Sequence, residues 1–196
     1  MNVNNCSIEL FYHNNHNEMN KYYINTNKIQ YLWYNSYNKL IQKNMKISDL
    51  ISEDLINLDI QSREKWKAIE ELSILLLNKA AISSIPEYLD DVRKRESLVT
   101  TGIGEGIAIP HAISDSVLIP SIAIGRSRIG VDYEAIDNQP VKLFFLFAIP
   151  SNGAEKQYLR NLADLARLLV HKEIIDRLLN ANGFREITET FQMKIN

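Results

Sequence analysis

The residues best suited to chemistry lie between Thr100 and His111, in the segment TTGIGEGIAIPH. A neutral imidazole can attack a phosphorus or carbonyl centre, and it can act as an acid or a base near physiological pH. Three glycines alternate with other residues before His111, a spacing that lets the backbone adopt positive φ and approach another group closely. Because a packed core would fill that space with side chains, the pattern favours a reactive or binding site around the histidine.

The residues on either side of His111 predict how it is held. Ile107 to Ile109 are expected to form a short buried strand, since β-branched residues suit a pleated surface. Pro110 fixes φ and lacks an N–H, so it is expected to end that strand and to present His111 in a defined direction. The amides of Ala112 to Ser114 could then form an anion-binding concavity. Phosphate chemistry is therefore the leading hypothesis.

Better-known phosphate and metal motifs do not fit the sequence. The glycines do not form GxGxxG, because Ile107 occupies the third glycine position, and there is no GxxxxGK[ST]. Within residues 45–196, only His111 and His171 could supply imidazole ligands to a metal. His171 is expected to be a surface residue or a cation near a helix end. His13 and His16 are spaced i, i+3 but have no further ligands nearby. We therefore expect no metal and no cofactor.

Composition excludes several classes of function. A formal net charge of −2 and a pI near 6.1 give no support for binding to nucleic acid or to an anionic membrane. Cys6 is the single cysteine, so an internal disulfide cannot form and a zinc cluster would lack thiolates. No apolar run reaches the ~18 residues of a membrane span, and the N-terminus does not resemble a signal peptide. We expect a cytoplasmic protein without direct membrane insertion and without a nucleic-acid partner.

Length and local composition predict one domain with an extension. The 196 residues suffice for one well-buried domain but not for two of ordinary size. Residues 1–44 are rich in Asn and Tyr and poor in aliphatic side chains, so they have little apolar surface to offset the entropy of ordering. Two interpretations of this low-complexity segment stay open: a disordered extension, or upstream sequence read as protein before a start at Met45. The folded domain is expected to span residues 45–196.

Hydrophobic periodicity and capping residues predict the elements that position His111. The run KLFFLFAIP has the character of a central strand covered on both faces. Ser62, Ser84 and Asn152 are expected helix N-caps, and Gly183 is an expected left-handed C-cap. Helices precede and follow the strands, which predicts an α/β fold with helices on both faces of a sheet. The expected elements are a strand at Asn57–Ile60, helices at Ser62–Lys79 and Ser84–Arg95, strands at Ile107–Ile109, Ser121–Ile129 and Lys142–Ile149, and helices at Asn152–Val170, Lys172–Ala181 and Arg185–Met193.

The run RESLVTTGIGEGIAIPHA, from Arg95 to Ala112, resembles the active-site signature of a known family. That family is enzyme IIA of the fructose/mannitol class in the bacterial phosphoenolpyruvate-dependent phosphotransferase system, and it includes stand-alone nitrogen-regulatory members. The similarity in the order of elements extends from about Met45 to about Phe191, a whole domain. It implies a three-layer α/β sandwich with a mixed, mostly parallel sheet of about five strands and helices on both faces.

The resemblance also implies roles for individual residues. His111 would be the phosphoryl acceptor and would form a tele-phosphohistidine intermediate. Arg95, in the family's Arg-Glu pair, would stabilise the phosphoryl group, because a guanidinium offers a planar fork of donors. Tyr158 occupies the position where many members have a second histidine, and a phenol can donate to a phosphoryl oxygen but brings no cation near neutral pH. The other implied substrate-binding residues are Thr101, Gly102 and Ser114.

The implied function is that of a phosphocarrier that receives phosphate on His111 from a phosphorylated histidine-containing carrier protein. In the nitrogen-regulatory version, which a chain without attached enzyme IIB or IIC sequence favours, partner proteins read the phosphorylation state. In the sugar-specific version, the phosphate passes to an enzyme IIB during fructose- or mannitol-type uptake. A third alternative is a binding module of the same fold whose histidine is never phosphorylated.

Overall fold

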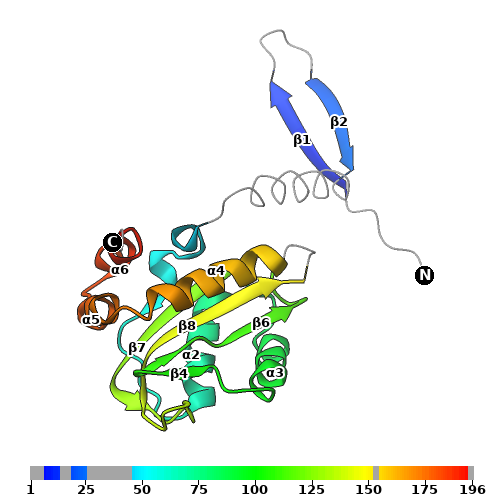
Figure 1. Ribbon diagram of the computed structural model, residues 1–196. Helices are drawn as coiled ribbons and strands as arrows, with labels where there is room; N and C mark the ends of the chain where they lie inside the picture. Colours follow the sequence, from blue (N-terminus) through cyan, green and yellow to red (C-terminus); the bar gives the residue numbers. More distant parts are fainter. Residues whose placement is uncertain (1–6, 14–18, 26–45, 152–154, 194–196) are drawn as a thin grey trace. The chain divides into compact units, whose positions relative to one another are not determined.

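The computed structural model describes residues 7–13, 19–25, 46–151 and 155–193 (Figure 1). The chain forms two compact units, Met1–Asn44 and Met45–Asn196. In the first unit, β1 (Ser7–His13) pairs antiparallel with β2 (Met19–Asn25). The expectation that residues 1–44 are a disordered extension or a misread start stays a prediction. Of the two histidines spaced i, i+3 in this segment, His13 ends β1 and His16 lies outside the described residues.

Within the described residues of the second unit, the expected helices and strands follow one another in the predicted order, and the structure adds further short elements between them. No helix in the described part of the chain combines the length and the apolarity needed to cross a membrane. The elements are η1 (Ile47–Leu50), η2 (Glu53–Leu55), β3 (Ile56–Asn57), α2 (Lys65–Asn78), α3 (Ile85–Glu96), β4 (Gly102–Gly104), β5 (Ile107–Ala108), β6 (His111–Ser114), β7 (Ser121–Val131), β8 (Val141–Pro150), α4 (Glu155–Leu168), α5 (Lys172–Asn180) and α6 (Phe184–Phe191).

Strand β8 is the centre of a six-stranded mixed sheet with the order β3-β7-β8-β5-β4, in which β6 also pairs with β8. It runs parallel to β5 and β6 and antiparallel to β7, and β3 runs parallel to β7. Every β8 side chain except Lys142 is buried, as the prediction of a central strand requires. The sheet has six strands where the resemblance implies about five, and β4 and β6 are short strands that are absent from the elements the sequence predicts.

Helices cover both faces of this sheet and confirm the α/β prediction (Figure 1). Alternate residues of β8 enter different apolar clusters, because successive side chains of a strand point to opposite faces. Phe144 and Leu146 pack with residues of α2 and α3, whereas Phe145 and Phe147 pack with residues of α4, α5 and α6. The two clusters fix the sheet between two helical layers.

Helix ends are predicted less well than helices. Ser84 caps α3 as expected, accepting from the amide of Glu87 at 3.4 Å. Ser62 does not cap α2, since its amide and hydroxyl both donate to the carboxylate of Glu71, and the N-cap is Glu64. Gly183 is not a left-handed C-cap: its φ of 178° is extended, and it precedes α6 as the N-cap. The expected cap Asn152 lies outside the described residues.

The backbone around Pro110 corrects another expectation. The proline interrupts the strand but does not end it, because β5 stops at Ala108 and β6 resumes at His111. The amide of Phe147 donates to the carbonyl of Pro110 at 2.9 Å, and His111 then pairs in register with Phe147. Residues 112–114 consequently form part of a paired strand and not the anion-binding concavity that the sequence suggests.

Candidate functional site

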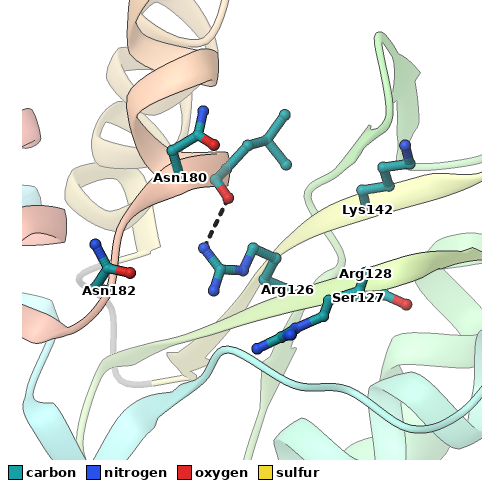
Figure 2. Close-up of a pocket in the computed structure, with 7 residues that line it drawn as sticks. Arg126, Ser127, Arg128, Lys142, Asn180 and Asn182 are labelled. Atoms are coloured by element: carbon teal, nitrogen blue, oxygen red, sulfur yellow. Dashed lines mark hydrogen bonds between the residues drawn. The ribbon is translucent and has the colours of Figure 1, made fainter.

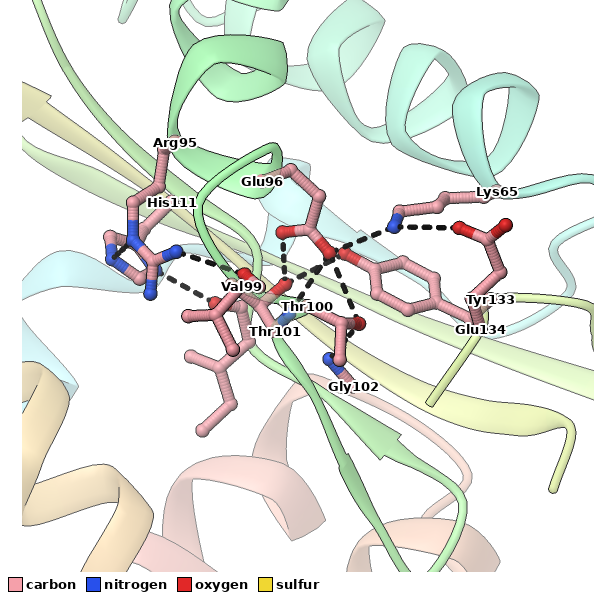
Figure 3. Close-up of polar contacts among 11 residues, drawn as sticks. Lys65, Arg95, Glu96, Val99, Thr100, Thr101, Gly102, His111, Tyr133 and Glu134 are labelled. Atoms are coloured by element: carbon pink, nitrogen blue, oxygen red, sulfur yellow. Dashed lines mark hydrogen bonds and ion pairs between the residues drawn. The ribbon is translucent and has the colours of Figure 1, made fainter. Parts of the chain in front are cut away.

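The structure brings Arg95 and His111 into direct contact (Figure 3). Arg95 lies in the last turn of α3, where cations suit the negative end of the helix dipole, and His111 opens β6. The Nε of Arg95 donates to Nε2 of His111 at 2.9 Å, and its Nη1 donates to the carbonyl of Val99 at 3.1 Å. Both side chains are half-buried, so part of each stays open to solvent.

The ring of His111 is held in one tautomer. Its Nδ1 lies 3.0 Å from the carbonyl oxygen of Ile109, and because a carbonyl can only accept, Nδ1 carries the proton. Burial lowers the pKa of His111 below its ordinary value and the charge of Arg95 lowers it further, while the Ile109 carbonyl opposes the shift. The imidazole is therefore neutral at pH 7, with the lone pair on Nε2.

Glu96, the neighbour of Arg95, anchors the turn that follows α3. Its buried carboxylate accepts from the amide of Thr101 at 2.9 Å and from the hydroxyl of Thr101 at 2.7 Å. It also forms an ion pair with Lys65 of α2 at 2.9 Å, where the two side chains are only 2% and 10% exposed. These contacts hold residues 97–101, including the Val99 carbonyl that Arg95 contacts.

Aromatic residues complete this cluster. The ammonium of Lys65 lies 4.6 Å from the ring centre of Tyr133, close enough for a cation–π contact. The hydroxyl of Tyr133 lies 2.8 Å from that of Thr101, and burial raises the pKa of Tyr133. Earlier on α3, the hydroxyl of Tyr88 donates at 2.8 Å to the carbonyl of Phe147, the residue paired with His111. Helix α3 is thus tied to the strand beside the histidine.

The glycines before His111 serve the backbone and not an open approach to the imidazole. Strands β4 and β5 form an antiparallel hairpin, in which Gly104 ends β4 at φ +90° and Gly106 lies in the turn at φ +73°. A Cβ on Gly102 would lie 2.7 Å from the Cα of Ala135, so this position must be glycine for the hairpin to pack. Thr101 and Gly102 therefore lie in the Glu96 cluster, and their contacts support Arg95 indirectly.

Two other residues indicated by the sequence lie on opposite faces of the sheet. Tyr158 of α4 is buried in the same apolar cluster as Phe147, and directly paired strand residues project to one face, so Tyr158 and His111 share a side of the sheet. Ser114, three residues after His111, projects to the other face. It is buried, and its hydroxyl lies 2.8 Å from that of Ser116. The structure does not bring Ser114 to the histidine.

Sequence reasoning did not find Lys65, Tyr133 or Tyr88. Lys65 and Tyr133 come from other parts of the chain than the Arg95–His111 segment, and Tyr88 lies seven residues before Arg95 on α3. Each resembles an ordinary residue of an amphipathic helix or loop. The single local signal was the acid next to Arg95, because a buried carboxylate beside a guanidinium requires further donors.

Comparison with known proteins gives the family. The family model described as "Phosphoenolpyruvate-dependent sugar phosphotransferase system, EIIA 2" matches residues 49–194. The PTS system fructose-specific EIIABC component of Bacillus subtilis (strain 168) is 44% identical over 139 residues, which are 71% of this chain and 22% of that protein. The chain thus spans about a fifth of the length of that relative.

Two shorter proteins match over nearly their full length. The PTS system fructose-specific EIIA component of Haloferax volcanii is 36% identical over 143 residues, 73% of this chain and 92% of that protein. The crystal structure of nitrogen regulatory protein IIA-Ntr from Neisseria meningitidis aligns with a TM-score of 0.68 at 29% identity, covering 74% of this chain and 98% of that one. Because the family model matches nearly all of the second unit, including the segment from Arg95 to His111, this chain belongs to the EIIA 2 family of the phosphoenolpyruvate-dependent sugar phosphotransferase system.

Proposed function

We propose that this chain is a phosphocarrier that accepts a phosphoryl group on Nε2 of His111. The observation that carries this proposal is the pair of contacts made by the two ring nitrogens. The Ile109 carbonyl holds the proton on Nδ1 and leaves Nε2 as the nucleophile. Arg95, at Nε2, lies beside the position that a transferred phosphoryl group would take, which is the geometry of a tele-phosphohistidine intermediate.

The transfer step uses these groups in sequence. The Nε2 lone pair attacks the phosphorus of a phosphohistidine on the donor protein. A new N–P bond forms at Nε2 of His111 while the P–N bond of the donor breaks, and the donor nitrogen takes back the electron pair. The Nε–H of Arg95 leaves Nε2 before the attack and then donates to the phosphoryl oxygens. The Ile109 carbonyl stabilises the charge that develops at Nδ1–H.

A protein donor fits the surface around His111. Leu98 and Val99, in the turn that Glu96 anchors, are 80% and 58% exposed. Ile113, two residues after His111 on the same face of β6, is 44% exposed. These three apolar side chains flank a polar centre, which is the composition of a protein docking site. The proposed donor is a phosphorylated histidine-containing carrier protein. Because that carrier receives its phosphate from phosphoenolpyruvate in the cytoplasm, we place this protein in the cytoplasm as well.

The acceptor distinguishes two versions of this function. We propose an enzyme IIB as the acceptor, because the fructose-specific relatives in Bacillus and Haloferax are more similar in sequence than the nitrogen regulatory protein. The structural similarity to IIA-Ntr keeps the nitrogen-regulatory version as the second candidate. Purified enzyme IIB of the fructose type separates the two, since it removes the label from a sugar-specific protein and leaves a regulatory one phosphorylated.

Incubation with phosphoenolpyruvate, enzyme I and the histidine-containing carrier tests the proposed function. We expect about one phosphoryl group per chain, labile in acid and stable in base, as a phosphohistidine is. If the protein takes up no label under these conditions, it is instead a binding module of the same fold whose histidine is never phosphorylated.

Replacing Arg95 tests its part in the transfer. We expect Arg95→Ala to slow labelling by about 100-fold, the loss typical of removing one donor aimed at developing negative charge. Arg95→Lys should recover part of the rate, because it keeps the charge and loses the planar fork. The matched control is Lys94→Ala, which removes the adjacent cation, 76% exposed and paired with Asp91. Equal labelling rates for Arg95→Ala and Lys94→Ala would remove Arg95 from the mechanism.

The pKa of His111 predicts how labelling depends on pH. Burial disfavours the imidazolium, so the proton should leave below the ordinary value of about 6.5. The nucleophilic form then persists as the pH falls through 6.5, and labelling declines only under more acidic conditions. NMR titration of the His111 ring protons measures the midpoint directly. A midpoint at or above about 6.5 would contradict the burial argument.

A further inference from the structure

A basic cavity lies away from His111, between the second half of β7, the start of β8 and the C-terminal end of α5 (Figure 2). Its volume is about 420 Å³, enough for a small metabolite. Three cationic side chains line it, Arg126, Arg128 and Lys142, and the seven described residues around it include no acid. In a chain with a formal net charge of −2, this concentration of positive charge is local and favours an anionic ligand.

Two of the three cations are available to a ligand. Within the described residues, the ammonium of Lys142 makes no hydrogen bond or ion pair, and its side chain is exposed. The guanidinium of Arg128 is 75% exposed and forms one ion pair, in which its Nε lies 3.6 Å from the also exposed carboxylate of Asp59. An exposed pair at that distance contributes little, so an anion in the cavity can compete for Arg128.

Arg126 forms the inner wall of the cavity. Its Nη1 donates at 2.7 Å to the carbonyl of Leu179 and at 2.7 Å to that of Ala181, where α5 ends. A helix C-terminus carries partial negative charge that would repel an anion, and the guanidinium offsets it. Arg126 therefore has a structural role, and it also makes this end of the cavity compatible with negative charge.

An irregularity in β7 shapes the basic wall. Between two ladder positions β7 advances from Arg126 to Val131, while β8 moves only from Leu143 to Val141, so β7 contains three extra residues. Gly130 at φ +86° closes this bulge, and its amide donates to the hydroxyl of Ser127 at 3.2 Å. Bulges redirect side chains and are frequent next to functional sites. Here the bulge follows Arg126 directly and includes Arg128.

Amide side chains give the cavity a second kind of recognition group. The amide nitrogen of Asn180 donates to the carbonyl of Asp176 at 2.7 Å, and that of Asn182 donates to the carboxylate of Glu186 at 3.3 Å. With their nitrogens occupied in this way, both amides present a carbonyl oxygen as acceptor. The amide oxygens suit a ligand with hydroxyl groups that donate to them. The cations on the other side of the cavity suit a ligand that also carries an anionic group.

We propose that this cavity binds a small phosphate ester of a polyhydroxy compound, such as a sugar phosphate. The charged ends of Lys142 and Arg128 point apart in the structure (Figure 2), and both exposed side chains turn toward the cavity to bind the phosphate, while Asn180 and Asn182 accept from the hydroxyls. The site is separate from the proposed phosphoryl site, because Lys142 and Phe147, the partner of His111, are five residues apart on β8, roughly 17 Å along an extended strand. A bound ester therefore does not compete with phosphorylation of His111.

Isothermal titration calorimetry with the full chain tests the proposal. The probes are fructose 1-phosphate, mannitol 1-phosphate and glycerol 3-phosphate, with fructose and inorganic phosphate as partial ligands. We expect saturable 1:1 binding of at least one ester, tighter than that of either partial ligand. Lys142→Ala and Arg128→Ala should each weaken it about tenfold, the loss expected for one charge-assisted hydrogen bond.

Control variants separate this cavity from other cations. Arg167→Ala removes an exposed arginine of α4 that pairs with Asp164 and should leave the affinity unchanged. Arg95→Ala should also leave it unchanged, whereas a loss there would assign the binding to the His111 site and overturn the proposal. Failure of all three esters to bind, or equal affinities for wild type and Lys142→Ala, would overturn it as well.

Discussion

His111→Ala is expected to abolish phosphoryl labelling of this protein completely. The imidazole Nε2 supplies the electron pair that forms the N–P bond, and no neighbouring group described at the site can replace it, since the guanidinium of Arg95 is a hydrogen-bond donor without an acceptor and Glu96 is buried among donors. Because the side chain is half-buried and contributes little to the apolar core, the variant should retain the thermal unfolding temperature of wild type within a few degrees. Labelling with phosphoenolpyruvate, enzyme I and the carrier protein measures the first quantity, and circular dichroism measures the second.

His171→Ala is the matched control for that experiment. His171 is exposed and precedes α5 as its N-cap, without a side-chain hydrogen bond there. The variant should be labelled at the wild-type rate. Label that survives in His111→Ala, or disappears in His171→Ala, would put the phosphoryl group on another residue and remove the basis of the proposed function.

Glu96→Ala is expected to lower the free energy of unfolding by about 3–5 kcal/mol, the usual cost of removing one partner from a buried ion pair. It would leave Lys65, whose side chain is only 10% exposed, without its nearest countercharge, and it would leave the amide and hydroxyl of Thr101 without their acceptor. The turn that holds Val99 would then loosen, and labelling should slow as well, because Arg95 loses a fixed position. Denaturant unfolding and the labelling rate report the two effects.

The exposed pair between Glu64 and Lys67 supplies a control at a neighbouring position. Its side chains are 69% and 63% exposed and lie 2.9 Å apart, so Glu64→Ala should cost less than about 1 kcal/mol and leave labelling unchanged. If Glu96→Ala costs no more than Glu64→Ala, the buried cluster does not support the site as described. A Glu96→Gln variant, which keeps an acceptor for Thr101 and loses the charge, measures the electrostatic part separately.

The central strand of the sheet could be predicted because its residues are almost all apolar. The run that forms β8 is apolar at nearly every position, and the structure buries it from both faces as such a run requires. The bounds of helix α3 could be predicted equally well, because Ser84 and Glu87 indicate its start and the basic residues through Arg95 indicate its end. These local signals are strong because each reflects contacts made within one element.

The short strands beside His111 were harder to read. Pro110 lacks an N–H, but the ladder at this point uses its carbonyl, which accepts from Phe147, so pairing continues through His111. The glycines mislead in a related way. Gly104 and Gly106 permit the tight turn of a hairpin and Gly102 permits close packing on Ala135, so their freedom serves the backbone.

The cluster around Glu96 and the basic cavity lay beyond sequence reasoning for a different reason. Lys65 and Tyr133 come from α2 and from the segment after β7, and nothing in their local sequence pairs them with Glu96. Likewise, Arg126 and Lys142 become neighbours of Asn180 only when α5 packs beside the sheet. Contacts between distant segments depend on the tertiary structure, which periodicity and capping do not specify.

The measurement that tests the central claim most directly is NMR of the phosphorylated protein, labelled with 15N at the histidine rings. Long-range 1H–15N correlations identify the tautomer of each ring, and coupling to 31P identifies the nitrogen bonded to phosphorus. The contacts to Arg95 and Ile109 predict phosphorus on Nε2 of His111 with the proton retained on Nδ1. Phosphorus on Nδ1, on another histidine or on no histidine would contradict the account.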